Sequence, residues 1–571
     1  MSTATALPSR PRAGGFRAPA ADFLGRPPRR LLSALAEAAV ACSTAVLFAY
    51  WATTVHVNPT TRVGQISGLA TLQFRLIAVG LPLLAVVTAT AFHGRGRLHR
   101  RVVRLACAGV AGLSTGFMAA GILVALSGTP WPLAGQGDDN GHLADWAAII
   151  IRSGHLTDIY PPLLPHVQAW WAVHFTGGEP SLAMKQLQAL LIALSGPAGY
   201  LSWRLFLRPL PALGVGMLST LPVVLLYKPY STLTLIILVP VLGKLVQVLR
   251  RAPHRPLRQS VTLGVVLGVV LALLFLLYAG WHVWSAPGVL LALLVFFPWR
   301  SGRQAVLRAG AFLGAVGLAF AALAGKYLLV LLSATGTKDR WCSPMVLVDP
   351  AYIGMSPYPY RGAGEMGAWP PPGEFGGVGW FSVLLLLGIG VALSLGLHRS
   401  PVVVTAACFL SAWAVRFWIS SHMERDQAVQ LYVRTFHELL YCGLVLLGWA
   451  AVLAGRALHR RLQGLPAPMP RTGRPLHRSR IAAVGVLTAG LLLGGTAASA
   501  TVDSYMPQDP KYGWLSGQAW YAHQIRKPDG TCPKYAQDGK CSDARPYATH
   551  LEPAGPDNGT MAGCDFPWKR D

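Results

Sequence analysis

Long runs of apolar residues, separated by short polar connections, recur along almost the whole chain. Each run is close to the roughly 20 residues that a helix needs to cross the hydrocarbon core of a bilayer. The runs lie at residues 31–55, 69–92, 105–129, 186–207, 209–227, 230–249, 259–279, 286–299, 309–333, 378–397, 401–420, 438–455 and 481–502. This pattern predicts an all-α polytopic membrane protein with a bundle of about 13 transmembrane helices. The 286–299 run is short and only YKPY divides the 209–249 pair, so the number of spans depends on how these segments fold.

Basic residues are concentrated in alternate connections between the runs. More than half of the 49 Arg and Lys residues lie in the N-terminal segment and in the connections near residues 93–104, 204–208, 244–258, 300–308, 398–400 and 456–480. Cytoplasmic loops of membrane proteins carry such an excess. We therefore expect residues 1–30 to form a disordered basic tail in the cytoplasm, followed by a membrane domain at 31–502.

The remaining connections face the outside by alternation. The large outer loops are residues 130–185, 334–377 and 421–437, and residues 503–571 form a small extracytoplasmic C-terminal region. The connections at 56–66, 227–230 and 279–288 are shorter. Cys342, Cys532, Cys541 and Cys564 fall outside, where an oxidising compartment lets Cys532 and Cys541 pair, although spacing does not establish the connectivity. The other four cysteines lie in apolar runs, as small buried hydrophobes do.

Composition supports the membrane class and changes how the charge is interpreted. The chain is 53% hydrophobic and 13% charged, against roughly 25% charged residues in soluble proteins. The formal net charge of +26 then reflects topology, so we expect a lipid bilayer as partner and no nucleic acid. The sequence contains no HExxH, CxxC or P-loop, so we expect no catalytic metal and no ATP-driven transport.

The motif GQGDDNGHLADW opens the 130–185 loop with two adjacent carboxylates, Asp138 and Asp139. If Asp139 or Asn140 caps a helix, one face of that helix is apolar and carries Leu143, Trp146, Ala147 and Ile150. The other face carries His142, Asp145 and Arg152. The helix dipole favours ionised acids at its N-terminus. Two interpretations stay open: a capped interfacial helix with solvated acids, which is the commoner case, and a pair of catalytic carboxylates.

Aromatic and cationic side chains in the outer loops offer further candidates. Tyr160 precedes two prolines, and the following helix carries Trp170 and Trp171, which suit either an interfacial aromatic belt or a platform for a sugar ring. Cations that could hold a lipid-linked phosphate occur in several outer segments; they are Lys228, Arg340, His422, Arg425 and Arg434. A surface role or contact with a lipid headgroup is the commoner use of any one of these residues.

The order of these motifs resembles that of a known enzyme family. GDDNGHLADW, then DIYPPLLPHVQAWWAV, then KPYS at a helix–helix turn, is similar to the bacterial galactan 5-O-arabinofuranosyltransferases of cell-wall arabinogalactan synthesis. These enzymes have the C-type glycosyltransferase architecture, a membrane bundle with its active site on the outer face. The resemblance covers the chain up to about residue 250 and is looser thereafter. It implies a multi-pass protein of the bacterial plasma membrane with an extracytoplasmic active site.

The resemblance also implies a reaction. The donor would be a decaprenyl-phosphate-linked β-D-arabinofuranose and the acceptor a galactofuranose hydroxyl of a galactan polysaccharide. Asp138 or Asp139 would act as general base in a single inverting displacement. Lys228, Arg340, His422, Arg425 and Arg434 would bind the departing phosphate, while His142, Asp145, Tyr160, Trp170 and Trp171 would contact the sugars. No cofactor is expected, because cationic side chains can replace a metal at a single phosphoryl group.

Other functions fit parts of this pattern. Another polyprenyl-phosphate-sugar transferase, such as a mannosyltransferase, would use the same acidic motif. A transporter or flippase for a lipid-linked sugar would place ionisable residues deep in several spans. The apolar runs here are nearly free of charge, and polar residues gather in the outer loops. That distribution favours an enzyme over a transporter or a scaffolding protein.

Overall fold

A computed structural model describes residues 28–93, 96–135, 139–156, 160–333, 380–426, 434–463 and 478–543. These residues form α-helices joined by turns, and one bridge between Ile525 and Ser542 is the extent of β-pairing in the described ranges. The long helices are α1 (Pro28–Trp51), α2 (Arg62–Phe92), α3 (Gly96–Ala125), α6 (Pro180–Trp203), α7 (Pro209–Thr220), α8 (Pro229–Leu249), α9 (Leu257–Leu277), α10 (Gly280–Phe296), α11 (Arg303–Ser333), α13 (Trp380–Gly396), α14 (Ser400–Asp426), α15 (Thr435–Gln463) and α16 (Arg478–Ser504). Shorter helices are α4 (Asp139–Ser153), α5 (Leu163–Phe175) and α17 (Trp514–Ala522), with 3-10 turns η1 (Ala52–Thr54), η2 (Ala252–His254), η5 (Pro510–Tyr512) and η6 (Gln537–Gly539).

The predicted all-α class is confirmed. Among the described residues, nine helices are long and apolar enough to cross a membrane: α1, α2, α3, α8, α9, α11, α14, α15 and α16. Helix α10 and residues 383–396 of α13 are apolar but shorter. The other two predicted spans fall on α6 and on α7, which has only 12 residues. The structure therefore agrees with a polytopic membrane protein, and the number of 13 spans stays a prediction.

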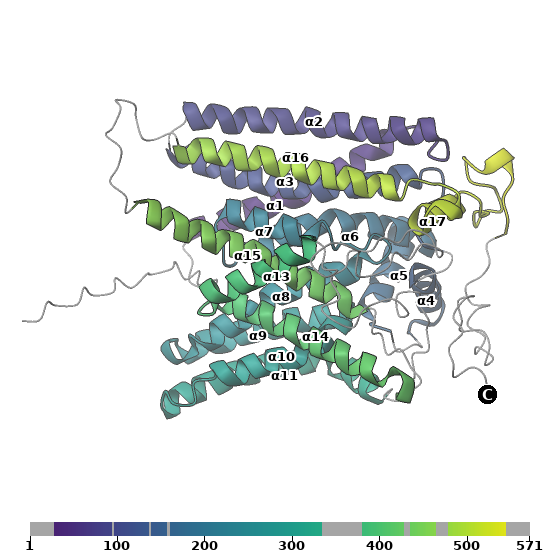
Figure 1. Cartoon of the computed structure of the whole chain (residues 1–571). Helices are drawn as coiled ribbons and strands as arrows, with labels where there is room; N and C mark the ends of the chain where they lie inside the picture. Colours follow the sequence, from purple (N-terminus) through teal and green to yellow (C-terminus); the bar gives the residue numbers. More distant parts are fainter. Residues whose placement is uncertain are drawn as a thin grey trace, which may run out of the picture.

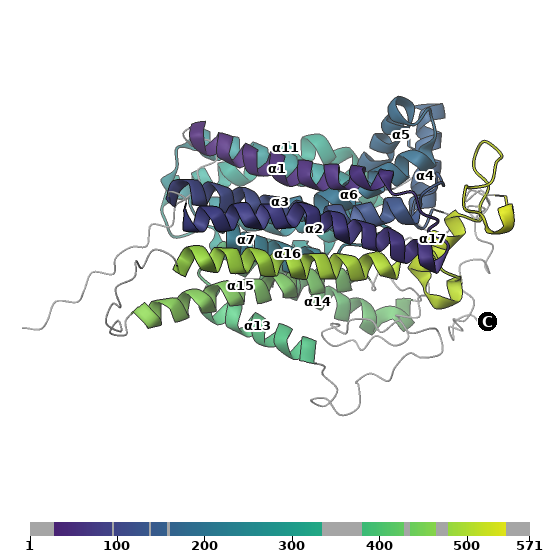
Figure 2. The ribbon, with the colours of Figure 1, turned by 90° about the horizontal axis from the view of Figure 1, so that it is seen from above.

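The long helices lie side by side in one bundle, and α4, α5 and α17 gather at one end of it (Figure 1). The view from above places the same three helices at that end (Figure 2). Helix α3 occupies the interior, in contact with α1, α2, α6, α7 and α16. In its most apolar stretch 94% of the residues are buried, whereas the corresponding figure for α11 is 11%. Helix α3 is thus a core element, and α11 lies on the outside of the bundle.

Small residues explain how α3 packs so closely against α1 and α6. A Cβ atom on Gly112 would lie 2.3 Å from the Ala41 carbonyl oxygen of α1, and one on Gly116 would lie 2.7 Å from the Ala45 oxygen. A Cβ on Gly196 of α6 would lie 2.3 Å from the Ala111 oxygen. Helices in membranes associate through such small residues because the backbones can then approach each other.

An ion-pair network joins three helices at the end of the bundle away from α4 and α5. Glu37 of α1 is 3% exposed and lies 3.1 Å from Arg104 Nε and 2.8 Å from Arg204 Nε. The Tyr200 hydroxyl donates to the same carboxylate over 3.1 Å. Two cations and a hydroxyl compensate the buried charge, so Glu37 pairs α1 with α3 and α6.

Two of the predicted outer loops are shorter than expected. The 279–288 segment was expected to be a loop, but α10 begins at Gly280 because Trp281 and Trp284 are buried in the core. Helix α14 continues to Asp426 and α15 begins at Thr435, so the 421–437 connection is also reduced. The whole of the predicted 334–377 loop lies outside the described residues, and with it Arg340 and Cys342. Residues 1–27 of the predicted tail and Cys564 also lie outside them.

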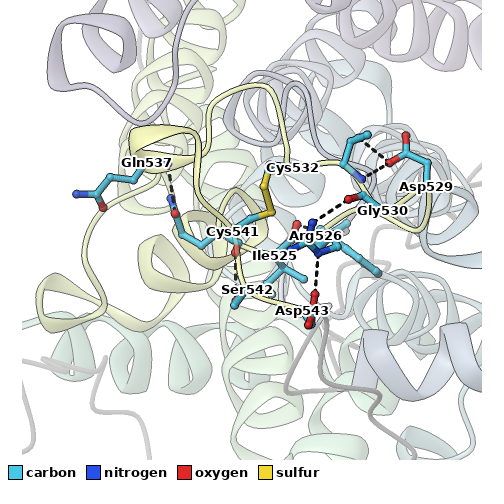
Figure 3. The surroundings of a disulfide bond; sticks show 12 residues. Ile525, Arg526, Asp529, Gly530, Cys532, Gln537, Cys541, Ser542 and Asp543 are labelled. Carbon is cyan, nitrogen blue, oxygen red and sulfur yellow. Dashed lines mark hydrogen bonds and ion pairs between the residues drawn. A yellow bond between two sulfur atoms is a disulfide. The ribbon is translucent and has the colours of Figure 1, made fainter.

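The C-terminal region packs onto the end of the bundle that carries α4 and α5. The Tyr505 hydroxyl donates to the Met118 carbonyl of α3 over 2.7 Å, and Trp131 Nε1 donates to the Ile525 carbonyl over 3.3 Å. A disulfide joins Cys532 to Cys541, as the sequence allowed. Figure 3 shows this disulfide beside Arg526, whose guanidinium Nε donates to Asp543 over 2.7 Å. Residues 505–543, which we call the C-terminal cap, are thus packed on this end of the bundle and cross-linked by a disulfide.

Candidate functional site

Asp139 begins α4, as the helix-start pattern predicted, and forms an ion pair with Lys228. Lys228 is the residue that precedes α8, where Pro229 occupies the first helical position. The side chains are 20% and 7% exposed, so the pair is largely removed from solvent. Asp138 lies outside the described residues. The acidic motif and the KPYS turn thus meet at Asp139 and Lys228, which are 89 residues apart in sequence.

The α4 helix has the predicted buried face, but its partner is protein. Leu143, Trp146, Ala147 and Ile150 are buried, with Leu143 and Trp146 in the main hydrophobic core. Helix α4 packs against α5 and α6. The interpretation of α4 as a helix lying apolar side down on the membrane is therefore wrong, because this face contributes to the protein core.

Two buried amides hold the segments around Asp139 together. Asn140 is 1% exposed, and its Nδ2 donates to the Leu133 and Tyr227 carbonyls over 2.7 and 2.6 Å. Gln188 of α6 accepts from the Leu133 N–H over 3.0 Å and donates to the Leu226 carbonyl over 3.1 Å. Both amides bridge the segment before α4 and the α7–α8 turn. They position Asp139 opposite Lys228.

Aromatic rings line the space next to this ion pair. His142 stacks on Trp146 with ring centroids 5.5 Å apart, and Trp146 lies 4.4 Å from Tyr160. The Tyr160 hydroxyl is hydrogen-bonded to that of Tyr230 in α8. Burial raises the pKa of Tyr160, while the Arg434 guanidinium acts in the opposite direction. At neutral pH this phenol therefore stays protonated and can donate a hydrogen bond.

The opposite side of the site comes from α9, α10 and α15. Lys228 Nζ lies 5.5 Å from the Tyr278 ring, and Tyr278 lies 5.2 Å from Trp281. The next ring is His437, 6.5 Å from Trp281. Arg434 acts electrostatically on His437 and on Tyr160, and Lys228 also acts on His437. The site therefore combines one described carboxylate with two cations among aromatic side chains.

Several residues of this site were missed from the sequence. Tyr230, Tyr278, Trp281 and His437 were not proposed as site residues, although KPYS and the YAGWHVW segment contain three of them. An aromatic residue within an apolar run reads as core or as interfacial belt. Contacts with Lys228 or Tyr160 distinguish Tyr230 and Tyr278, and Trp281 and His437 follow through Tyr278. These contacts are between residues far apart in sequence.

Other predicted residues lie in different surroundings. Arg425 is exposed near the end of α14 and pairs with Asp426 over 2.8 Å, and His422 stacks on Trp418 of the same helix. Trp170 is 53% exposed beside other exposed apolar residues of α5, which favours the aromatic-belt interpretation. Trp171 Nε1 donates to Gln186 Oε1 over 2.8 Å and so anchors α5 to α6. The described contacts do not join these four residues to the Asp139–Lys228 pair.

Asp145 lies two turns into α4 and is half-buried. Burial raises the pKa of its carboxyl, and the charge of Arg152 partly opposes that shift. Within the described ranges, no three His, Cys, Asp or Glu side chains are grouped as ligands of a metal ion. Comparison with known proteins does not extend the assignment, since no family model and no curated protein matches this chain.

Proposed function

We propose that this protein is a membrane glycosyltransferase that uses a polyprenyl-phosphate sugar on the outer face of the bacterial plasma membrane. The observation that carries the proposal is the ion pair of Asp139 with Lys228 at one end of an apolar helical bundle, beside Tyr160 and His437, on which the charge of Arg434 also acts. A carboxylate suits removal of a proton from an acceptor hydroxyl, and two cations suit a phosphate leaving group. The aromatic rings beside them suit a sugar.

The specific reaction that we propose is transfer of arabinofuranose from decaprenyl phosphate to galactan. The acceptor oxygen attacks the anomeric carbon, the bond from that carbon to the phosphate oxygen breaks, and the acceptor proton passes to Asp138 or Asp139. Lys228 forms an ion pair with Asp139. A donor phosphate would compete for Lys228, and the carboxylate released from it would become a stronger hydrogen-bond acceptor.

The orientation and the number of spans belong to the same proposal. We propose that α6, α7, α10 and α13 cross the membrane together with the nine long apolar helices, which would give the 13 spans that the sequence predicts. The basic connections then face the cytoplasm. The end that carries α4, α5 and α17 faces the outside, where lipid-linked sugar and polysaccharide acceptor would meet.

The test is transfer from radiolabelled decaprenyl-phosphoarabinose to galactan oligosaccharides by the purified protein in nanodiscs. We expect Asp138→Asn or Asp139→Asn to lower kcat by about 10²–10⁴-fold, the contribution of a positioned base. Asp538→Asn, in the exposed C-terminal region, is the matched control and should retain full activity. Full activity of both variants in the motif would contradict the base assignment. Movement of intact donor across the bilayer without transfer would instead support a flippase.

A further inference from the structure

An open cavity lies apart from the Asp139–Lys228 pair, where the start of α2 meets the C-terminal region. Its volume is about 390 Å³. Thr60, Arg62 and Gln65 line one wall, and residues 507–509 with Tyr512 and Trp520 line the other. Sites for small molecules typically enclose about 300–1,000 Å³. The cavity has room for one or two sugar units.

Buried contacts fix the two walls relative to each other. Gln65 is 4% exposed, and its Nε2 donates to the Pro59 carbonyl over 3.1 Å and to the Pro507 carbonyl over 2.5 Å. Arg62 adds an ion pair with Asp503 at 3.4 Å. One amide hydrogen of Gln65 is thereby bonded within its own wall, and the other joins the two walls. A cavity formed in advance loses little conformational freedom when a ligand binds.

The groups around the cavity match a neutral polyol. Gln508 brings an amide and Asp509 a carboxylate, while Tyr512 and Trp520 bring apolar ring surface. Thr60 donates its hydroxyl hydrogen to Asn58 over 2.7 Å, so its oxygen remains an acceptor. A sugar presents hydroxyls that donate and accept, next to C–H groups that pack against rings.

The local charges favour an uncharged ligand over a phosphate. Arg62 pairs with Asp503, and Asp509 lies 3.7 Å from Lys511 Nζ while also accepting from the Lys511 backbone N–H over 3.0 Å. Each cation at the cavity is thus matched by a carboxylate. An anion would have to displace one of these carboxylates, whereas a neutral saccharide need not.

Helix α17 links this cavity to the proposed active site. The Trp514 ring lies 5.0 Å from that of Tyr227, the residue before Lys228. Trp520 lies six residues further along the same helix, a distance of about 9 Å at 1.5 Å per residue. From this arrangement we infer that the cavity binds a saccharide unit of the acceptor polysaccharide, at a distance of several sugar units from the reacting hydroxyl. The inference rests on the proposed function.

Acceptors of two lengths test the inference on the full chain in nanodiscs. We expect Trp520→Ala to raise KM for a galactofuranosyl hexasaccharide about tenfold, which equals ~1.4 kcal/mol of binding energy. The KM for the disaccharide, which is too short to reach the cavity, should stay unchanged. Trp520→Phe keeps a flat ring and should restore most of the affinity. Tyr521→Ala removes the neighbouring aromatic side chain, which does not line the cavity, and should change neither KM.

Direct binding separates failure of this inference from failure of the proposed function. Calorimetric titration of the wild type with the hexasaccharide should show binding that Trp520→Ala weakens, whether or not transfer occurs. An equal rise in KM for both acceptor lengths would overturn the inference, as would unchanged hexasaccharide binding by Trp520→Ala. Absence of transfer to either acceptor by the wild type would contradict the proposed function alone.

Discussion

At the scale of single residues, the pairing of Asp139 with Lys228 is the central contact of the proposed site. Both side chains are largely buried, so exchanging either partner of the ion pair for water costs free energy. The buried amides of Asn140 and Gln188 prevent the two segments from separating. A substrate that takes Lys228 from Asp139 must therefore offer comparable negative charge. This requirement favours a phosphate-linked donor over a neutral sugar as the ligand of Lys228.

Another buried residue, His523, makes the attachment of the C-terminal region dependent on pH. Its Nε2–H donates to the Ala125 carbonyl at the end of α3 over 2.8 Å. Burial lowers the pKa of His523 to about 4, and the charge of Lys185 adds to this effect. The unfolded value is about 6.5. The stabilising contribution is thus complete above pH 6.5 and is lost as the pH falls from there towards 4, at up to about 1.4 kcal/mol per pH unit.

Hydrogen exchange in the 505–543 segment measures this contribution. We expect exchange in the wild type to accelerate between pH 6.5 and 4 beyond the intrinsic change in rate. His523→Gln keeps an N–H donor but does not titrate, so its protection should depend less on pH. His166 is exposed on α5, and His166→Gln serves as the control that leaves the wild-type pH profile in place. Identical profiles for wild type and His523→Gln would contradict the assignment.

At the scale of helices, close packing of α1 on α3 depends on Gly112 and Gly116. A Cβ on Gly116 would meet backbone atoms of Ala45 at 2.7–2.9 Å, and backbone cannot rotate away as a side chain can. Gly116→Ala should therefore lower the free energy of unfolding by about 1–3 kcal/mol, the usual cost of overpacking. Gly109 is the matched control on the same helix, because a Cβ there would meet only Leu83 Cδ2 at 3.8 Å. Thermal unfolding in detergent compares the two variants, and equal midpoints would contradict this account of the α1–α3 contact.

The helices were easier to predict than the contacts between them. The 230–249 run corresponds to α8 at Pro229–Leu249, and the 31–55 run to α1 at Pro28–Trp51. Apolar length alone determines such segments, since a backbone in lipid must satisfy its hydrogen bonds within a helix. The 279–288 segment was expected to be a loop because the apolar run begins only at residue 286, whereas Trp281 Nε1 donates to the Ser231 carbonyl over 2.6 Å inside the bundle. The same holds for the site. The acidic motif and Lys228 could be recognised in the sequence. The place of partners such as His437 depends on tertiary contacts, which leave no periodic pattern in the sequence.

At the scale of the whole molecule, the basic residues and the disulfide bear independently on the orientation of the protein in the membrane. The described connections between α6 and α7, α8 and α9, α10 and α11, and α13 and α14 carry basic residues and lie at the end of the bundle opposite α4, α5 and α17 (Figure 1). The positive-inside rule predicts that this end faces the cytoplasm. The Cys532–Cys541 disulfide lies at the other end, in the C-terminal cap. Structural disulfides persist in oxidising compartments and are rare in the cytosol. Both observations support our proposal that the cap and the proposed active site face the outside.

Labelling of native cysteines in intact cells tests this orientation. Cys107, Cys408 and Cys442 are buried and Cys42 lies within α1, so in a Cys342→Ser/Cys564→Ser background Cys532 and Cys541 are the accessible candidates. A membrane-impermeant maleimide should fail to modify the protein before reduction and should label it after mild reduction. A Cys532→Ser/Cys541→Ser variant is the control and should stay unlabelled in both conditions. Labelling that requires permeabilised cells would place the cap in the cytoplasm. It would then contradict an outer active site, because Tyr227 and Trp514 join the cap directly to the turn that carries Lys228.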